Sequence, residues 1–443
     1  MRTAREVALE LLSRVRTTEA YANLLLPELI AQAKLSKADA AFCVELSFGT
    51  LRNQGFYDWV IGKATKRDIG AIDADALEVI RLGAHQILGM RTPAHAALNE
   101  TVNLAKSALK QGAVGFVNAA LRRISERTRE EWVAQLKREE ENHLATLYSH
   151  PRWMVTALKL ALESDGRTDL EKLLAANNDA PSVNLVALPN HPFELDDHLE
   201  RVGVSPIGYQ LDSGDPAELL GFKTGALRVQ DQGSQLAALA LSRCKPNSGE
   251  SRWLDLCAGP GGKAALLAAE AENLGIELVA NEISNHRARL VEQALRSSGL
   301  KAKVTNQDGR TLKAGLFDRI MIDAPCTGLG ALRRRPESRW RKSPDDLKEL
   351  TSLQGDLIES GWRQLKAGGV LAYVTCSPHP AETTAIVSKL LGSHRDAELI
   401  DAGDVLERIS DEFIRNPNRK TAQLWPHTND TDAMFIALIR KVG

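Results

Sequence analysis

Two stretches of the chain pair an apolar strand with a cysteine. Phe317–Asp323 is mostly apolar and leads into Ala324-Pro325-Cys326, and a second apolar run ends at Cys376. This pattern is typical of a buried strand whose carboxyl end opens into an active site. Because a thiolate is a nucleophile, we expect chemistry at Asp323, Cys326 and Cys376 rather than core strands followed by inert thiols.

Methylation of an unreactive ring carbon is a reaction that needs such thiols. A thiolate that adds to C6 of a pyrimidine makes C5 able to attack a sulfonium methyl group, after which the C5 proton and the thiol must leave. These steps call for a nucleophilic cysteine, a hydrogen-bond donor near N3 and a group that assists release. Asp323, Cys326 and Cys376 can fill these roles if their strands are neighbours, and the residues alone leave open which thiol attacks.

A glycine loop and carboxylates follow the other predicted strands. Gly259-Pro260-Gly261-Gly262 matches neither GxGxxG nor GxxxxGK[ST], which disfavours a dinucleotide and a nucleoside triphosphate. Glu282 stands where it can accept both hydroxyls of a ribose, and Asp308 and Asp323 end the next two strands. A single such carboxylate is more often a helix cap or turn residue. The series beside the loop favours S-adenosyl-L-methionine, with Glu282 on the ribose.

The elements that position these residues alternate between short apolar runs and helices from about Ser251 onward. This alternation predicts a parallel doubly wound sheet. We expect its strands at residues 253–257, 277–280, 303–305, 317–323, 369–376 and 433–439.

The preceding part of the chain has a different pattern. From Arg2 to about Ile124 the apolar residues recur at helical spacing, which predicts an all-α domain. Residues 130–248 combine helical patterns with β-like runs such as Val183–Val186 and many turn residues, which predicts a small α+β connecting domain. The chain is therefore expected to be multidomain, with an all-α domain, a small α+β domain and an α/β Rossmann-like domain at 1–129, 130–248 and 249–443.

Composition and charge limit the cellular compartment and the kinds of partner that we expect. The formal charge is -1, yet residues 1–129 hold 18 Lys and Arg against 13 Asp and Glu, which indicates an anionic partner or a solvated helical surface. The five cysteines form no CxxC pair, and no apolar stretch is long enough to span a bilayer. We therefore expect a cytoplasmic protein that binds no membrane. We also expect no metal site, since no His/Cys cluster has ligand spacing.

Other basic residues and thiols have competing interpretations. The segment Ala331–Lys342 carries six basic residues and Trp340 beside the predicted site, which predicts a loop that grips phosphates and stacks a base. The arginines between 122 and 129 could also bind phosphates, although a solvated helix face is the commoner explanation. Cys43, Cys244 and Cys257 lie in helical or strand patterns and are expected to be structural thiols.

Several of these motifs together resemble the RNA cytosine-C5 methyltransferases of the Sun/Fmu family. They are Asp255-Leu256-Cys257-Ala258-Gly259-Pro260-Gly261-Gly262-Lys263, Asp323-Ala324-Pro325-Cys326, Arg334-Arg335-Pro336 with Trp340, and Thr375-Cys376-Ser377. The amino-terminal region, with Pro93–Glu100 and Phe116–Asn118, resembles the helical RNA-binding domain of the antitermination factor NusB. The likeness covers nearly the whole chain and is weakest between about 190 and 225.

The resemblance implies a monomeric enzyme that makes 5-methylcytidine in RNA, with 16S rRNA as the expected target and S-adenosyl-L-methionine as the cofactor. It assigns the attack on C6 to Cys376, product release to Cys326 and contact with the cytosine to Asp323. The implied cofactor-binding residues are Cys257, Ala258, Gly259, Pro260, Gly261, Gly262, Lys263, Glu282, Asp308 and Asp323. The alternatives are the same chemistry on tRNA and a non-catalytic NusB-like RNA-binding protein.

Three motifs depart from the family pattern. Ala258-Gly259 replaces the usual Ala-Ala, Pro380-Ala381-Glu382-Thr383 replaces Pro-Glu-Glu-Asn, and Asp432-Ala433-Met434-Phe435 replaces Asp-Gly-Phe-Phe. The first change removes one methyl group and should leave cofactor binding intact. The other two bear on the shape of the base pocket and the choice of nucleotide.

Overall fold

The computed structural model describes residues 2–18, 20–245 and 249–443. Its contacts group the chain in two compact units. Unit 1 comprises Met1–Thr156, Leu174–Asp179 and Leu332–Arg341, and unit 2 comprises Ala157–Leu173, Ala180–Ala331 and Lys342–Gly443. The division into domains at 1–129, 130–248 and 249–443 stays a prediction.

The amino-terminal part of unit 1 is helical, as the apolar spacing predicts. Its helices are α1 (Ala4–Thr17), α2 (Ala22–Ala33), α3 (Lys37–Arg52), α4 (Gln54–Thr65), η1 (Ile69–Ala71), α5 (Ala74–Leu88), α6 (Ala94–Ala108), α7 (Gln111–Ser125), α8 (Arg129–Glu139) and α9 (His143–Leu147). In α1, Thr3 and Glu6 form a reciprocal capping box that satisfies backbone N–H groups. Val7 and Leu11 of this helix are fully buried. Helices α10 (Arg152–Ser164) and α11 (Leu170–Ala176) follow.

The segment Leu332–Arg341 is built into unit 1 through Arg339, which lies in η3 (Pro336–Trp340). The Arg339 side chain is fully buried. Its guanidinium donates to the carbonyl oxygens of Arg52 at 2.9 Å, Ser149 at 3.1 Å and Asn177 at 2.7 Å, and to the side-chain oxygen of Asn178 at 2.7 Å. Burial and the charge of Arg52 lower the pKa of Arg339 to about 9.

The prediction of a phosphate-gripping loop is therefore wrong for Arg339. A buried guanidinium whose N–H groups point at protein carbonyls has no donor directed toward a nucleic acid. Arg341 likewise donates to the backbone of Val15 and Ala20. The Trp340 side chain remains 41% exposed.

Unit 2 contains a small antiparallel sheet. Its strands are β1 (Val183–Ala187), β2 (Leu199–Glu200), β3 (Gly208–Leu211) and β4 (Leu227–Val229), in the order β2-β3-β1-β4. Leu185, Leu199, Leu211 and Leu227 form its core together with Leu219, which lies between η2 (Pro216–Glu218) and α12 (Leu220–Lys223). The β-like run predicted at Val183–Val186 is β1.

The large sheet of unit 2 has eight strands among the described residues. They are β5 (Arg252–Asp255), β6 (Glu277–Asn281), β7 (Lys303–Thr305), β8 (Phe317–Asp323), β9 (Leu365–Thr375), β10 (Ala397–Ile400), β11 (Ala422–Gln423) and β12 (Phe435–Lys441). The order is β10-β12-β9-β8-β5-β6-β7, with β11 paired to β12. Strands β9, β8, β5, β6 and β7 are parallel, as predicted, whereas β12 runs antiparallel to β9, β10 and β11.

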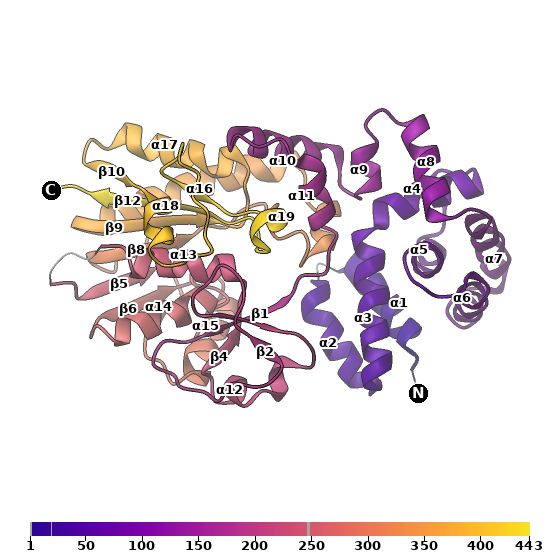
Figure 1. The fold of residues 1–443 in the computed structure, drawn as a ribbon, viewed down its shortest axis with the longest axis horizontal. Helices are drawn as coiled ribbons and strands as arrows, with labels where there is room; N and C mark the ends of the chain where they lie inside the picture. Colours follow the sequence, from indigo (N-terminus) through magenta and orange to yellow (C-terminus); the bar gives the residue numbers. More distant parts are fainter. Residues whose placement is uncertain (1, 19, 246–248) are drawn as a thin grey trace. The chain divides into compact units, whose positions relative to one another are not determined.

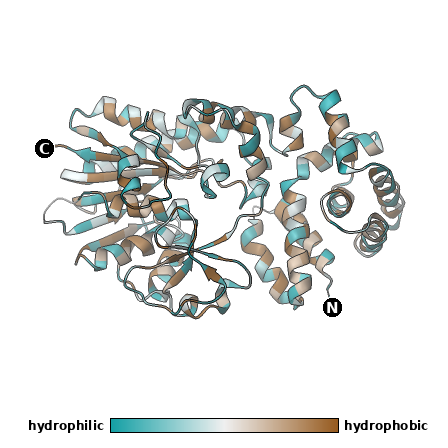
Figure 2. Ribbon diagram, in the orientation of Figure 1, coloured by the Kyte–Doolittle hydropathy of each residue, from teal (hydrophilic) through white to brown (hydrophobic). Residues whose placement is uncertain are grey.

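Helices cover both faces of this sheet (Figure 1). On one face lie α13 (Gln232–Ser242), α14 (Gly262–Glu272), α15 (Asn285–Ser297) and α18 (Ala402–Glu407), and on the other lie α16 (Pro344–Gln364) and α17 (Thr384–Ser393). Successive side chains of β9 point to opposite faces of the sheet, and each face has its own hydrophobic core. Val370 and Ala372 lie in the core under α13, α14, α15 and α18, and Leu371 and Tyr373 lie in the core under α16 and α17. Much of the sheet is accordingly brown in Figure 2.

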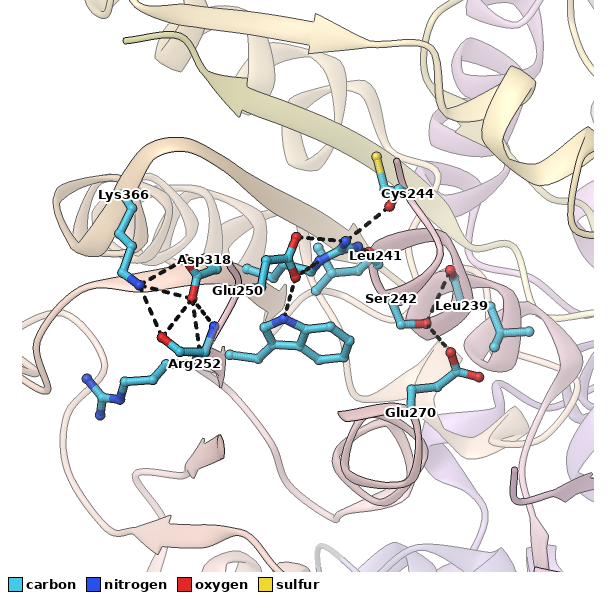
Figure 3. A network of polar contacts seen from close by, with 12 residues as sticks. Leu239, Leu241, Ser242, Cys244, Glu250, Arg252, Glu270, Asp318 and Lys366 are labelled. Atoms are coloured by element: carbon cyan, nitrogen blue, oxygen red, sulfur yellow. Dashed lines mark hydrogen bonds and ion pairs between the residues drawn. The ribbon is translucent and has the colours of Figure 1, made fainter. Parts of the chain in front are cut away.

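A polar network fixes the amino ends of the central strands (Figure 3). The Arg319 guanidinium on β8 forms two hydrogen bonds, of 2.8 and 2.9 Å, with the Glu250 carboxylate, which also accepts from the Trp253 indole at 3.0 Å. Lys366 on β9 pairs with Asp318 on β8 at 2.9 Å. These contacts join β5, β8 and β9 at their amino ends. The predicted site residues lie at the opposite, carboxyl ends of the strands.

The described part of the chain contains no helix long and apolar enough to cross a membrane. The structure also has elements that the sequence analysis did not predict. These are the strands β10 and β11 and the short helix α19 (Pro426–Asn429).

Candidate active site

The two predicted thiols meet at the carboxyl edge of the large sheet. Strands β8 and β9 are parallel neighbours in which Asp323 lies opposite Val374, which confirms the adjacency on which the sequence argument depended. The loops that follow these strands bring the Sγ atoms of Cys326 and Cys376 to 3.4 Å from each other. Two thiols at this separation can act on adjacent atoms of one substrate.

The environment of Cys326 favours its protonated form. The hydrogen bond with Cys376 and burial raise the pKa of the Cys326 thiol well above its ordinary value. The negative charges of Cys376 and Glu382 add to this effect. In the free protein Cys326 is therefore a thiol rather than a thiolate at neutral pH.

Lys263 carries a positive charge to the same edge. It lies in the first turn of α14, directly after the glycine loop, and its Nζ donates to Asp323 Oδ2 at 2.9 Å and to Ser234 Oγ at 3.1 Å. Burial works against the ammonium, but the charge of Asp323 and the hydrogen bond with it outweigh this effect and raise the pKa of Lys263. The ion pair holds the Asp323 carboxylate at the end of β8.

Asp255, at the end of β5, is a second carboxyl group at this edge. Its side chain is fully buried. Burial and then the charge of Asp323 raise the pKa of Asp255 to about 8. The sequence analysis did not single out Asp255 as a site residue, although its place before the glycine loop is a signal that could have found it.

The glycine loop is shaped by two close approaches. Gly261 has φ of 110°, and a Cβ atom there would lie 2.8 Å from the Cβ of Ala294 and 3.0 Å from the Cα of Val291. A Cβ atom on Gly259 would lie 2.3 Å from Oε2 of Glu282. Both positions therefore need glycine for the arrangement that the structure has.

The structure brings Glu282 to the loop and leaves Asp308 at the surface. The buried Glu282 carboxylate accepts the backbone N–H groups of Gly259 at 3.0 Å and Ser284 at 2.9 Å. Asp308 pairs with Arg310, whose hydrogen bonds lower the pKa of the Asp308 carboxyl. Both residues lie beyond the carboxyl ends of β6 and β7, as predicted.

The remaining thiols have the surroundings expected of structural cysteines. Cys43 and Cys244 are buried, and burial raises the pKa of Cys43 to about 11. Cys257 is only partly exposed. Burial and the charges of Asp255 and Asp323 raise its pKa well above the ordinary value. None of the three lies in the pair formed by Cys326 and Cys376.

Glu382 is a buried carboxylate between the two thiol-bearing loops that the sequence analysis did not include among the site residues. It lies in the short element η4 (Pro380–Glu382), which has too few residues to give a periodic signal. The signal in the sequence is the motif Pro380-Ala381-Glu382-Thr383, in which Glu382 keeps one carboxylate of the family pattern. Among the described residues no group of three or more His, Cys, Asp or Glu side chains could hold a metal ion.

Comparison with known proteins agrees with this geometry. The family model described as "16S rRNA methyltransferase RsmB/F" matches residues 242–440, and the NusB family model matches residues 2–126. The chain is 42% identical to "Putative methyltransferase MT1451" of Mycobacterium tuberculosis, over 99% of this chain and 96% of that protein. It is 32% identical to "Ribosomal RNA small subunit methyltransferase B" of Serratia proteamaculans, over 94% of each chain.

A solved structure shares the fold along the whole chain. The crystal structure of PH0851 superposes with a TM-score of 0.79 and 21% identity, covering 98% of this chain and 97% of that one. The similarity shows that the arrangement of helices and sheets in this chain is that of a known fold. The chain belongs to the RsmB/F family of 16S rRNA methyltransferases and is an RNA methyltransferase with a NusB-type helical domain.

Proposed function

We propose that this protein transfers a methyl group from S-adenosyl-L-methionine to C5 of a cytidine in RNA, through a covalent bond between Cys376 and C6. The observation that carries the proposal is the 3.4 Å separation of Cys326 Sγ and Cys376 Sγ at the ends of two adjacent strands. Methylation of an exocyclic amine needs no thiol, whereas methylation at C5 needs one to form and then break a bond at C6.

The residues present fit the proposed cofactor. The segment Cys257–Lys263 would cradle its amino-acid end, since its three glycines let the backbone approach a ligand closely. Glu282 and Asp308 would bind its nucleoside, and Asp323 lies where cofactor and base meet. The cofactor supplies a methyl group on a positively charged sulfur, which the carboxylates at this edge favour electrostatically. Each oxygen of Glu282 accepts one backbone N–H group and retains a lone pair that can accept a ribose hydroxyl.

Asp323 would face the base. A carboxylate accepts hydrogen bonds, and the exocyclic amine of cytosine donates one where uracil has a carbonyl oxygen. The contact therefore selects cytosine over uracil. Lys263 keeps Asp323 in place through their 2.9 Å ion pair.

The reaction begins when the Cys376 thiolate adds to C6, which forms the S–C6 bond and moves electron density to C5. C5 then takes the methyl group. Loss of the C5 proton restores the C5=C6 double bond as the S–C6 bond breaks, and Cys376 leaves as a thiolate.

Cys326 is suited to the release step. Its hydrogen bond with Cys376 is the largest cause of its raised pKa, and this bond is lost once the Cys376 sulfur is joined to C6. Loss of that hydrogen bond would lower the pKa of the Cys326 thiol in the covalent intermediate. Once this thiol has passed its proton to solvent, the resulting thiolate can accept the C5 proton.

The small-subunit rRNA is the proposed substrate because several relatives that match almost the whole chain are named ribosomal RNA small subunit methyltransferase B. The test is to incubate the protein with labelled cofactor and, separately, with 16S rRNA and with tRNA, and then to digest the RNA to nucleosides. Labelled 5-methylcytidine from the rRNA supports the proposal. Label in another nucleoside contradicts the C5 chemistry, and label only in tRNA contradicts the substrate.

A further inference from the structure

Glu382 lies at the centre of a hydrogen-bonded cluster between β8 and β9. Its side chain is fully buried. The carboxylate accepts the backbone N–H of Thr327 at 2.8 Å, the hydroxyl of Thr327, the hydroxyl of Ser377 at 2.6 Å and the amide of Gln354 at 3.1 Å. Its own carbonyl oxygen accepts the Tyr373 hydroxyl at 2.8 Å.

The donors of this cluster flank both thiols. Thr327 directly follows Cys326, and Ser377 directly follows Cys376. Gln354 on α16 also donates to the carbonyl oxygen of Pro325, at 2.9 Å. A single carboxylate thus ties together the two loops that carry the sulfur atoms.

We propose that Glu382 is a positioning residue that holds the loops of Cys326 and Cys376 in the mutual register that the reaction requires. This inference rests on the proposed function, because only a reaction that uses both thiols needs them at a fixed separation. The two loops follow different strands. Among the described residues, their other links are the backbone hydrogen bonds from Gly330 N–H to the Cys376 carbonyl and from Ala324 N–H to the Val374 carbonyl, and the 3.1 Å contact between the Thr327 and Ser377 hydroxyls, which both donate to Glu382. The buried charge of Glu382 is satisfied only when both loops are docked on it, which makes the arrangement cooperative.

A carboxylate of this kind could instead serve stability alone, and Glu250 is the matched case. Glu250 is also a largely buried carboxylate in the same sheet, and it accepts hydrogen bonds from Trp253 and Arg319. It lies just before the amino end of β5 (Figure 3), whereas Cys326 and Cys376 follow the carboxyl ends of β8 and β9. A substitution there perturbs a similar network without touching the loops of Cys326 and Cys376.

The test measures how readily the two thiols join. The protein alone, without RNA or cofactor, is treated with diamide, which oxidises two thiols to a disulfide and is itself reduced to the hydrazine. Mass spectrometry of the digested protein then gives the rate at which the Cys326–Cys376 disulfide forms. Wild type, Glu382→Ala, Glu382→Gln and Glu250→Gln are compared, with melting temperature and cofactor binding recorded for each.

We expect Glu382→Ala to slow this disulfide at least tenfold and to lower kcat for methyl transfer by a similar factor, with KM for the cofactor within about twofold of wild type. Glu382→Gln should recover most of the pairing rate, because its amide oxygen can accept from Thr327 and its NH2 group can donate to the hydroxyls. Glu250→Gln should lower the melting temperature and leave pairing unchanged.

Pairing at the wild-type rate in Glu382→Ala, together with a lower melting temperature, would show that Glu382 acts on stability alone and would overturn the proposal. If Glu382→Ala does not fold, Ser377→Ala and Gln354→Met each remove one donor and should slow pairing severalfold, and wild-type rates in both would overturn it equally. The disulfide assay contains no RNA, so it tests the positioning role separately from methylation. If Glu382→Ala slows disulfide formation but the wild-type protein makes no 5-methylcytidine, the proposed function is refuted and the positioning of the two loops by Glu382 is not.

Discussion

The sulfur atoms of Cys326 and Cys376 lie 3.4 Å apart although 50 residues separate them in the chain. The parallel pairing of β8 and β9 explains this, since both strands present their carboxyl ends at one edge of the sheet. The opposite edge of the same strands is fixed by ion pairs that involve Asp318, Arg319 and Lys366. Chemistry and anchoring therefore occupy opposite ends of the same two strands.

Removal of the charge on Lys263 should impair methyl transfer. Hydrogen bonds to charged groups contribute about 1.5–3 kcal/mol, so Lys263→Met should lower kcat/KM about tenfold or more by releasing Asp323. Steady-state methyl transfer to RNA measures this. Lys366→Met is the control, because it breaks an ion pair of the same 2.9 Å length at the other edge of the sheet. Equal losses of activity in the two variants would contradict the role given to Lys263.

Asp255 should make the protein less stable as pH rises. Its folded-state pKa of about 8 lies above the usual value of 3.8 for an aspartate, so the folded protein binds the proton more tightly than the unfolded chain. The stabilisation is complete below pH of about 4 and is lost as pH rises to about 8. Asp255→Asn removes the titrating group and keeps the shape. The melting temperature of the variant relative to wild type should increase between pH 5 and 8, and a constant difference would contradict the assignment.

The two glycines of the loop should respond differently to alanine. At Gly259 the added methyl group meets the carboxylate end of Glu282, a flexible side chain that can move away and remain available to a ribose. Gly259→Ala should therefore bind cofactor at least as tightly as wild type in calorimetry. At Gly261 the methyl group meets the backbone of α15, and φ of 110° is strained for alanine. Gly261→Ala should weaken binding at least tenfold, and the reverse order would refute this interpretation of the loop.

Arg339 should matter for stability and not for phosphate binding. Loss of a buried guanidinium that donates to five oxygen atoms leaves those acceptors unsatisfied, at a cost of about 1–3 kcal/mol for each affected group. Arg339→Met should lower the melting temperature clearly. The dependence of RNA affinity on salt should keep the wild-type slope, because a lost phosphate contact reduces that slope by about 0.7–0.9. A reduced slope would restore the phosphate-binding interpretation.

The sequence predicted the parts of this protein whose signals are local. Short apolar runs lie within β5, β6, β8 and β9, whereas β7 has only Val304. The polar residues after these strands correctly marked Cys326, Cys376, Glu282 and Asp308 as residues that follow strand ends. The antiparallel direction of β12 could not be predicted, since an apolar run has the same composition in either direction. Charge alone wrongly predicted that Arg339 binds phosphate, because the burial of its side chain depends on which carbonyl groups the fold brings together. Glu382 was missed for the same reason: its partners come from three separate segments.

The most direct measurement of the proposed reaction is the covalent protein–RNA adduct on denaturing electrophoresis. Cys326→Ala and Cys376→Ala are each incubated with cofactor and labelled 16S rRNA. Cys326→Ala should accumulate an adduct that survives denaturation, because Cys376 still attacks C6 while release is blocked. Cys376→Ala should form none. An adduct that depends on Cys326 and persists without Cys376 would reverse the two roles and contradict the proposed mechanism.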